Sequence, residues 1–150
     1  MKNLFDTGAA DEIKQRIHRL TPTTVAGWGK MNVAQMLAHC QRPMEMALGE
    51  IPLTPAGFFK KILGRMIKGV ITSPKPYKPN LPTDVAFITT ASEHDFELQK
   101  EKLLNTVNRF IQHQDKVADI PHPFFGKLSK DECGKAQYKH MDHHLGQFGV

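Results

Sequence analysis

The sequence has few of the features that mark special classes of protein. Only two cysteines, Cys40 and Cys133, occur among 150 residues, which excludes a disulfide-stabilised secreted scaffold. No apolar run approaches the roughly 18 residues that a transmembrane helix needs. The N-terminal stretch MKNLFDTGAADEI lacks the apolar centre of a signal peptide. We therefore expect a cytoplasmic protein, and we interpret both cysteines as small buried residues.

Composition and charge fit an ordinary globular domain. Hydrophobic residues make up 40% of the chain and charged residues 23%, so residues 1–150 are expected to form one domain. The formal net charge is +5, and 51–83 hold six basic residues and no acidic one. These are Lys60, Lys61, Arg65, Lys68, Lys75 and Lys78. Because no recognition motif accompanies them, we interpret the run as a solvated face and expect neither nucleic acid nor a membrane as partner.

Apolar residues recur at helical spacing in several segments. The expected helices cover 11–20, 32–49, 54–67, 92–114 and 129–147. Helix-capping patterns mark three of the starts: Asn32 with Gln35, Ser92 with Asp95, and Ser129 with Glu132. Pro43 lies inside the second segment, where it removes a backbone hydrogen bond. We expect it to kink that helix or to end it early.

The chain between the third and fourth helical segments has a different character. Residues 73–82 read SPKPYKPNLP, and four prolines in ten residues predict an extended crossover rather than a helix. Residues 85–90, VAFITT, have the composition of extended chain or of a lone edge strand. With no further strands to build a sheet, the pattern predicts an all-α bundle.

The last helical segment contains HMDHH, with His140 and His144 four residues apart. On a helix this spacing places both side chains on one face, with Cβ atoms roughly 5–6 Å apart, so that two imidazoles can converge on one metal ion. The same face carries Cys133, Gln137 and Phe148, which indicates that it is buried. A pair of histidines bonded to buried carbonyl groups, or a half-exposed pair, is the alternative interpretation.

A third ligand is needed for a metal site, and His39 is the candidate. It precedes Cys40 at the edge of the apolar stripe of the second helix, which in a bundle can face the last helix. His143 points about 100° away from His144 and is expected near the site or at the surface, although it could replace His144 beside His140. No chemistry is assigned to the remaining four histidines, His18, His94, His113 and His122.

Longer motifs connect the chain to a known superfamily. A histidine in NVAQMLAHC followed near the C-terminus by HMDHHLGQ resembles the DinB-like/YfiT-like superfamily of metal-dependent proteins. The segments KNLFD, WGKMNVAQMLAHCQ, NLPT, HPFFGKLS and YKHMDHHLGQFGV are similar to those of one uncharacterised branch, a domain of unknown function. The resemblance extends over nearly the whole chain. It implies a four-helix bundle of up-down-down-up type, with the proline-rich crossover in the region of helices two and three.

The resemblance also implies a divalent metal ion held by His39, His140 and His144. Nickel or zinc is the expected metal, with iron or manganese as alternatives, and a homodimer is the expected assembly. Other branches are similar to thiol-dependent transferases, so we expect a metal-dependent transferase or hydrolase that acts on a small molecule, with a low-molecular-weight thiol as a candidate partner. Gln147, Asp142 and His143 are candidates to support the ligands. A non-catalytic metal-binding module is the alternative.

Overall fold

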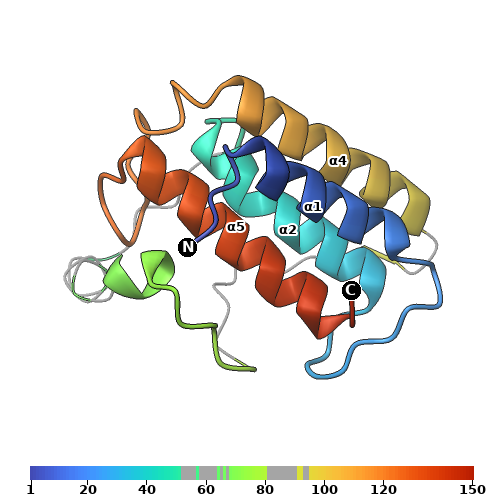
Figure 1. Cartoon of the computed structure of the whole chain (residues 1–150). Coiled ribbons are helices and arrows are strands. Elements are labelled where there is room, and N and C mark those ends of the chain that lie inside the picture. The colour runs from blue at the N-terminus through green and yellow to red at the C-terminus, as the bar shows by residue number, and fades with distance from the viewer. Residues whose placement is uncertain (52–56, 58–63, 65, 67, 81–90, 93–94) are drawn as a thin grey trace.

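The computed structural model describes residues 1–51, 57, 64, 66, 68–80, 91–92 and 95–150, and helices joined by loops make up this part of the chain. Its long helices are α1 (Thr7–Arg19), α2 (Val33–Ala47), α4 (Phe96–Gln112) and α5 (Lys130–Gln147) (Figure 1). Within these ranges there is no β-strand, and a single isolated bridge joins His122 to Gly126. The all-α prediction is confirmed. No helix in the described ranges is long and apolar enough to cross a membrane.

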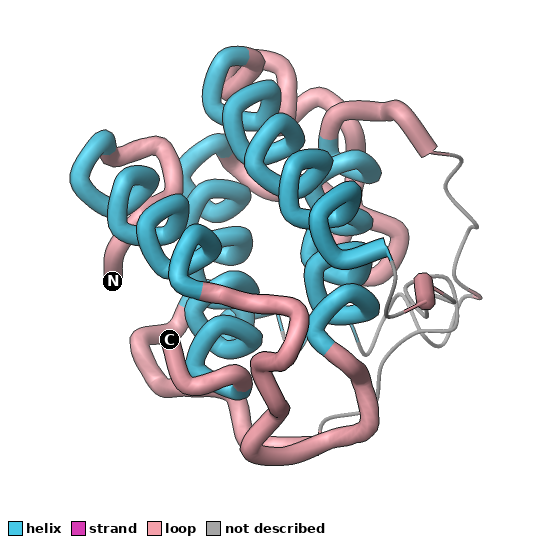
Figure 2. The backbone as a smooth tube through the Cα atoms, turned by 90° about the vertical axis from the view of Figure 1, so that its right-hand side faces the viewer, coloured by secondary structure: helices cyan, strands magenta, loops and turns pink. Residues whose placement is uncertain are grey.

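The four long helices pack around one apolar core. Helices α1 and α2 each contact both α4 and α5 (Figure 1), and Figure 2 shows the helices running alongside one another. Eleven large side chains, drawn from all four helices and from the N-terminal segment, have no exposed surface. They are Leu4, Ile13, Ile17, Met36, Leu37, Met44, Leu103, Val107, Phe110, Met141 and Leu145. Burial of such side chains is the main favourable term for the fold.

Helix α2 begins and ends with the local interactions that its sequence predicts. Asn32 accepts a hydrogen bond from the Gln35 backbone at 2.8 Å, and the Gln35 side chain accepts one from the Asn32 backbone at 3.1 Å. At the other end Gly49 takes a left-handed φ of 74°, and the amides of Gly49 and Glu50 bond back into the last turn. Of the two outcomes expected at Pro43, a kink or an early end, the early end is wrong. The helix continues to Ala47, because one missing hydrogen bond is outweighed by the packing of the following turn.

Helix α5 starts as predicted, and the α-helix α4 is defined from Phe96. Ser129 accepts from the Glu132 backbone at 3.2 Å and the Glu132 carboxylate accepts from the Ser129 backbone at 2.8 Å, which completes the capping box. In α4 the Asp95 carboxylate does bond to the Ser92 backbone at 2.9 Å. Asp95 is itself 3₁₀-helical and is the N-cap of α4, whereas residues 93–94 lie outside the described residues, so the predicted start at Ser92 stays a prediction.

Two further helix boundaries differ from the prediction, and several expectations fall on residues outside the description. Helix α1 starts at Thr7 rather than at residue 11, because Ala9 and Ala10 are buried and extend its apolar face by one turn. Residues 64, 66 and 68–72 are helical, so the third helical segment continues beyond residue 67. Its predicted start at 54, the extended segment 85–90 and three of the six basic residues, Lys60, Lys61 and Arg65, lie outside the described residues.

Candidate metal centre

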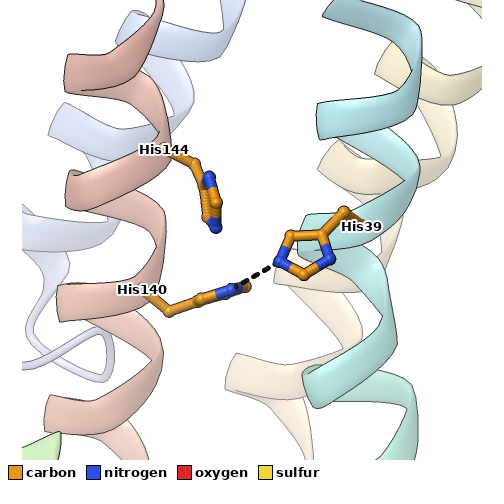
Figure 3. Close-up of side chains that lie close together, drawn as sticks. All are labelled: His39, His140 and His144. Atoms are coloured by element: carbon orange, nitrogen blue, oxygen red, sulfur yellow. Dashed lines mark hydrogen bonds between the residues drawn. The ribbon is translucent and has the colours of Figure 1, made fainter. Parts of the chain in front are cut away.

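Three histidines from two helices face one another across the interface of α2 and α5. His39 comes from α2, whereas His140 and His144 come from successive turns of α5 (Figure 3). The Nε2 atoms of His39 and His140 lie 3.1 Å apart. One ring nitrogen of each histidine lies within 4.8 Å of those of the other two. The structure therefore brings together the three side chains that the sequence and the resemblance singled out.

Local structure explains how the three rings meet. The spacing of four residues stacks His140 and His144 on one face of α5, with ring centroids 4.7 Å apart. The ring centroid of His39 lies 5.0 Å from that of His140 and 4.7 Å from that of His144. His39 and His144 are buried, with 4% and 8% of their surface exposed. The capping box at Ser129 fixes where α5 begins.

The surroundings of the triad favour neutral imidazoles. Burial, with the neighbouring rings of His144 and His39, holds the pKa of His140 well below its ordinary value. Burial, and then the proximity of His39, lowers the pKa of His144 to about 4. At neutral pH both rings therefore carry a lone pair on one nitrogen. Neutral imidazole is the form that binds a metal ion, because a proton and a metal compete for the same lone pair.

The donor set and the spacing fit a transition-metal ion. Three imidazoles that bind zinc tetrahedrally, with bonds of about 2.0–2.1 Å, hold their nitrogens about 3.3 Å apart. Nε2 of His39 and Nε2 of His140 lie 3.1 Å apart, and a separation as wide as the 4.8 Å limit would have to shorten by about 1.5 Å. In addition, Nδ1 of His140 is buried and has no hydrogen-bond partner among the described residues. An all-nitrogen set suits zinc, nickel or iron rather than magnesium or calcium.

His143 lies beside the triad and not in it. Its ring centroid is 5.0 Å from that of His144, 5.9 Å from that of Trp28 and 5.6 Å from that of Tyr77. The two aromatic rings therefore contact His143 next to the histidine triad. The open possibility that His143 takes the place of His144 is not favoured by the structure, because the grouped nitrogens belong to His39, His140 and His144.

The other candidate residues have separate roles. Asp142 forms an ion pair with Arg16 of α1 at 2.7 Å. His122 accepts hydrogen bonds through Nδ1 from the backbone amides of Phe124 and Phe125, and burial lowers its pKa to about 4, so it organises its own loop. His18 and His113 lie at the exposed ends of α1 and α4, and His94 is outside the described residues.

Both cysteines are buried, as predicted. Cys40 has no exposed surface and Cys133 has 5%. Burial raises the pKa of both thiols, to about 11 for Cys133. They are therefore protonated at neutral pH, and neither belongs to the histidine group.

Sequence reasoning missed one residue beside the site. Lys139 precedes His140 and is only 6% exposed, although it carries an ammonium group. Its Nζ donates to the backbone oxygens of Val70 and Ser73 and lies 4.3 Å from the centroid of Tyr77. Carbonyl groups at and just beyond the end of the helical residues 68–72 thus balance its charge. The sequence signal for this residue was a lysine among positions that are buried. Its hydrogen-bond partners lie more than 60 residues away along the chain, so local patterns could not identify them.

Comparison with known proteins defines the family and nothing narrower. No curated protein and no solved structure gives a significant match to the chain. One family model does match, over residues 2–149, and its description is "Protein of unknown function (DUF1569)". Because the match covers almost every residue, the chain belongs to the DUF1569 family.

Proposed function

We propose that this chain is a divalent-metal-binding protein of the DinB-like type, a four-helix bundle of up-down-down-up connectivity in which His39, His140 and His144 hold the ion. The observation that carries the proposal is the convergence of three ring nitrogens within 4.8 Å of one another. Neutral rings, buried surroundings and an all-nitrogen donor set support it. Nickel or zinc suits this donor set best, with iron or manganese as alternatives.

The site is proposed to act on a small molecule. A divalent ion with three protein ligands keeps open positions, at which it lowers the pKa of bound water to about 7 or stabilises a thiolate. The chain's own contribution is to orient three imidazoles and to exclude water from their unliganded sides. Metal-dependent transfer from a low-molecular-weight thiol, or hydrolysis, is the reaction class that we favour, in a cytoplasmic homodimer.

A non-catalytic metal-binding module is the second candidate. One observation favours it: among the described residues no carboxylate joins the histidine group, and Asp142 is paired with Arg16. A catalytic site commonly needs such a group to move a proton. Turnover of thiols with electrophiles, or of hydrolysable esters and amides, by the metal-loaded protein would exclude the module, whereas retained metal without turnover would support it.

The first test is the metal content of protein purified without a histidine tag. We expect near-stoichiometric nickel or zinc in the wild type and its loss in both His39→Ala and His140→Ala. His18→Ala is the matched control, because this exposed histidine lies at the end of α1 and outside the triad. A wild type that takes up no nickel, zinc, iron or manganese would contradict the proposal.

A further inference from the structure

The side chain of Gln147 connects the triad to the Trp28 loop, which we define as residues 26–29. Gln147 is the last residue of α5 and is 4% exposed. Its Oε1 lies 2.9 Å from Nδ1 of His144, and its Nε2 donates to the backbone oxygen of Trp28 at 2.6 Å. One buried amide therefore contacts a proposed ligand on one side and a loop 119 positions away on the other.

These two contacts fix the direction of the amide. The oxygen of Trp28 can only accept a hydrogen bond, so the group that faces it must be the amide nitrogen of Gln147. The amide oxygen must then face His144. Since that oxygen can only accept, Nδ1 of His144 must carry the hydrogen. The lone pair of the neutral ring is left on Nε2, the nitrogen opposite Gln147.

The Trp28 loop also restricts where Gln147 can lie. The backbone amide of Gly27 donates to the backbone oxygen of Gln147 at 2.7 Å. Gly29 has a left-handed φ of 83°, and a Cβ atom there would lie 2.6 Å from Nε2 of Gln147. The absence of a side chain at Gly29 thus leaves the space that the amide occupies. Backbone and side chain of Gln147 are both held by the same loop.

We infer that Gln147 is a positioning residue, which holds His144 in the tautomer that presents Nε2 to the metal. The inference rests on the proposed function for its consequence, namely metal affinity, but the tautomer itself is a property of the metal-free protein. Partners of this kind on the far nitrogen of a ligand histidine typically change metal affinity by about 10–100-fold when they are removed.

Two substitutions distinguish the hydrogen bond from Gln147 to the ring of His144 from its hydrogen bond to the Trp28 loop. Gln147→Leu removes both hydrogen bonds, whereas Gln147→Glu keeps an acceptor for Nδ1 of His144 and loses the donor to Trp28. Gln41→Leu is the control, because Gln41 is an equally buried amide, also 4% exposed, that bonds to α4 instead of the triad. Circular dichroism establishes that each variant is folded before it is compared.

The readouts are the ring tautomer, from ¹⁵N NMR of the metal-free protein, and the dissociation constant for nickel or zinc, from competition with a chelator. We expect His144 to be protonated at Nδ1 in the wild type, in Gln147→Glu and in Gln41→Leu. In Gln147→Leu we expect a mixture of tautomers and a metal affinity about 10–100-fold weaker. Affinity in Gln147→Glu should remain close to that of the wild type.

Two results would overturn the inference. One is a wild-type tautomer and affinity in Gln147→Leu. The other is an equal loss of affinity in Gln147→Glu and Gln147→Leu, which would assign the effect to loop anchoring. A wild type that binds no metal, while its His144 tautomer still depends on Gln147, would overturn the proposed function and support the positioning role.

Discussion

Helix α2 buries two polar clusters on opposite faces, and they differ in how their hydrogen bonds are satisfied. Gln41 faces α4, where its Nε2 lies within 3.0–3.2 Å of the Leu37 backbone oxygen and of two oxygens of Gln99. His39, two residues earlier, faces His140, whose buried Nδ1 has no partner in the described part of the chain. The amide cluster has acceptors for its donor group and holds two helices together. The histidine cluster keeps one buried ring nitrogen, Nδ1 of His140, without a partner among the described residues.

Metal binding should produce the largest difference in stability between variants of the two clusters. At a free metal concentration of 1,000 times its dissociation constant, the free energy of unfolding should rise by about 4 kcal/mol, and Tm by roughly 8–16 °C. Differential scanning fluorimetry with and without nickel or zinc measures this shift. We expect it to vanish in His140→Ala and to persist in Gln41→Leu. Equal metal-induced Tm shifts in His140→Ala and Gln41→Leu would show that the metal does not bind at the histidine cluster.

Acid should weaken the histidine cluster and leave the amide cluster unaffected. The pKa of His144 is about 4 in the folded chain against an ordinary 6.5, so the unfolded chain binds the proton more readily. The stabilisation is fully present above about pH 6.5 and is lost as the pH falls towards 4, by about 3 kcal/mol for this ring alone.

Chemical denaturation of the metal-free protein across this pH range measures that loss. Gln41→Leu should show the wild-type slope, whereas His144→Leu should show a shallower one, with the remainder coming from His140 and His122. A slope unchanged by His144→Leu would show that the ring is not held neutral by its surroundings.

Leucine substitutions compare the two clusters in the metal-free state. Gln41→Leu leaves the oxygens of Gln99 without their donor, so we expect a loss of about 1–3 kcal/mol. His140→Leu removes a buried Nδ1 that has no partner among the described residues, but it also removes the Nε2 that bonds to His39. These two effects oppose each other, so we expect a change of about 1 kcal/mol or less. Urea denaturation measures both, and a larger loss in His140→Leu would indicate that the histidine cluster stabilises the fold by itself.

The smallest expected effect concerns the support of the histidine cluster by the Trp28 loop. Gly29→Ala imposes a left-handed φ on alanine and a close approach to Gln147, and should cost about 1 kcal/mol. Gly8→Ala is the matched control, because no heavy atom lies within 4 Å of its Cβ position and α1 tolerates alanine. Thermal unfolding compares the two, and an equal effect would remove the argument for a tight contact at Gly29.

Much of the fold, and the paired histidines, follow from local rules. Local patterns predicted the capping boxes at Asn32 and Ser129 and the shared face of His140 and His144. Each of these features involves residues within one or two helical turns of one another, so it can be read from the sequence. The start of α1 was missed because tertiary burial of the small residues Ala9 and Ala10 decided it.

Contacts between distant segments were beyond local reasoning. Whether His39 faces His140 depends on how α2 and α5 are rotated about their axes relative to each other. The resemblance to a known superfamily indicated that the two residues meet, whereas the spacing of residues in the sequence did not. The bonds of Gln147 to Trp28 and of Lys139 to Val70 join a helix to loops and helix ends far along the chain. No periodicity encodes such pairs, since each is set by how whole elements pack.

X-ray absorption spectroscopy of the nickel- or zinc-loaded protein tests the central claim most directly, because it counts the ligands and identifies their atoms. We predict three imidazole nitrogens at about 2.0–2.1 Å with the remaining positions filled by light atoms, and one imidazole fewer in His39→Ala. A sulfur ligand at about 2.3 Å, or a shell of oxygens with fewer than three imidazoles, would contradict the histidine site.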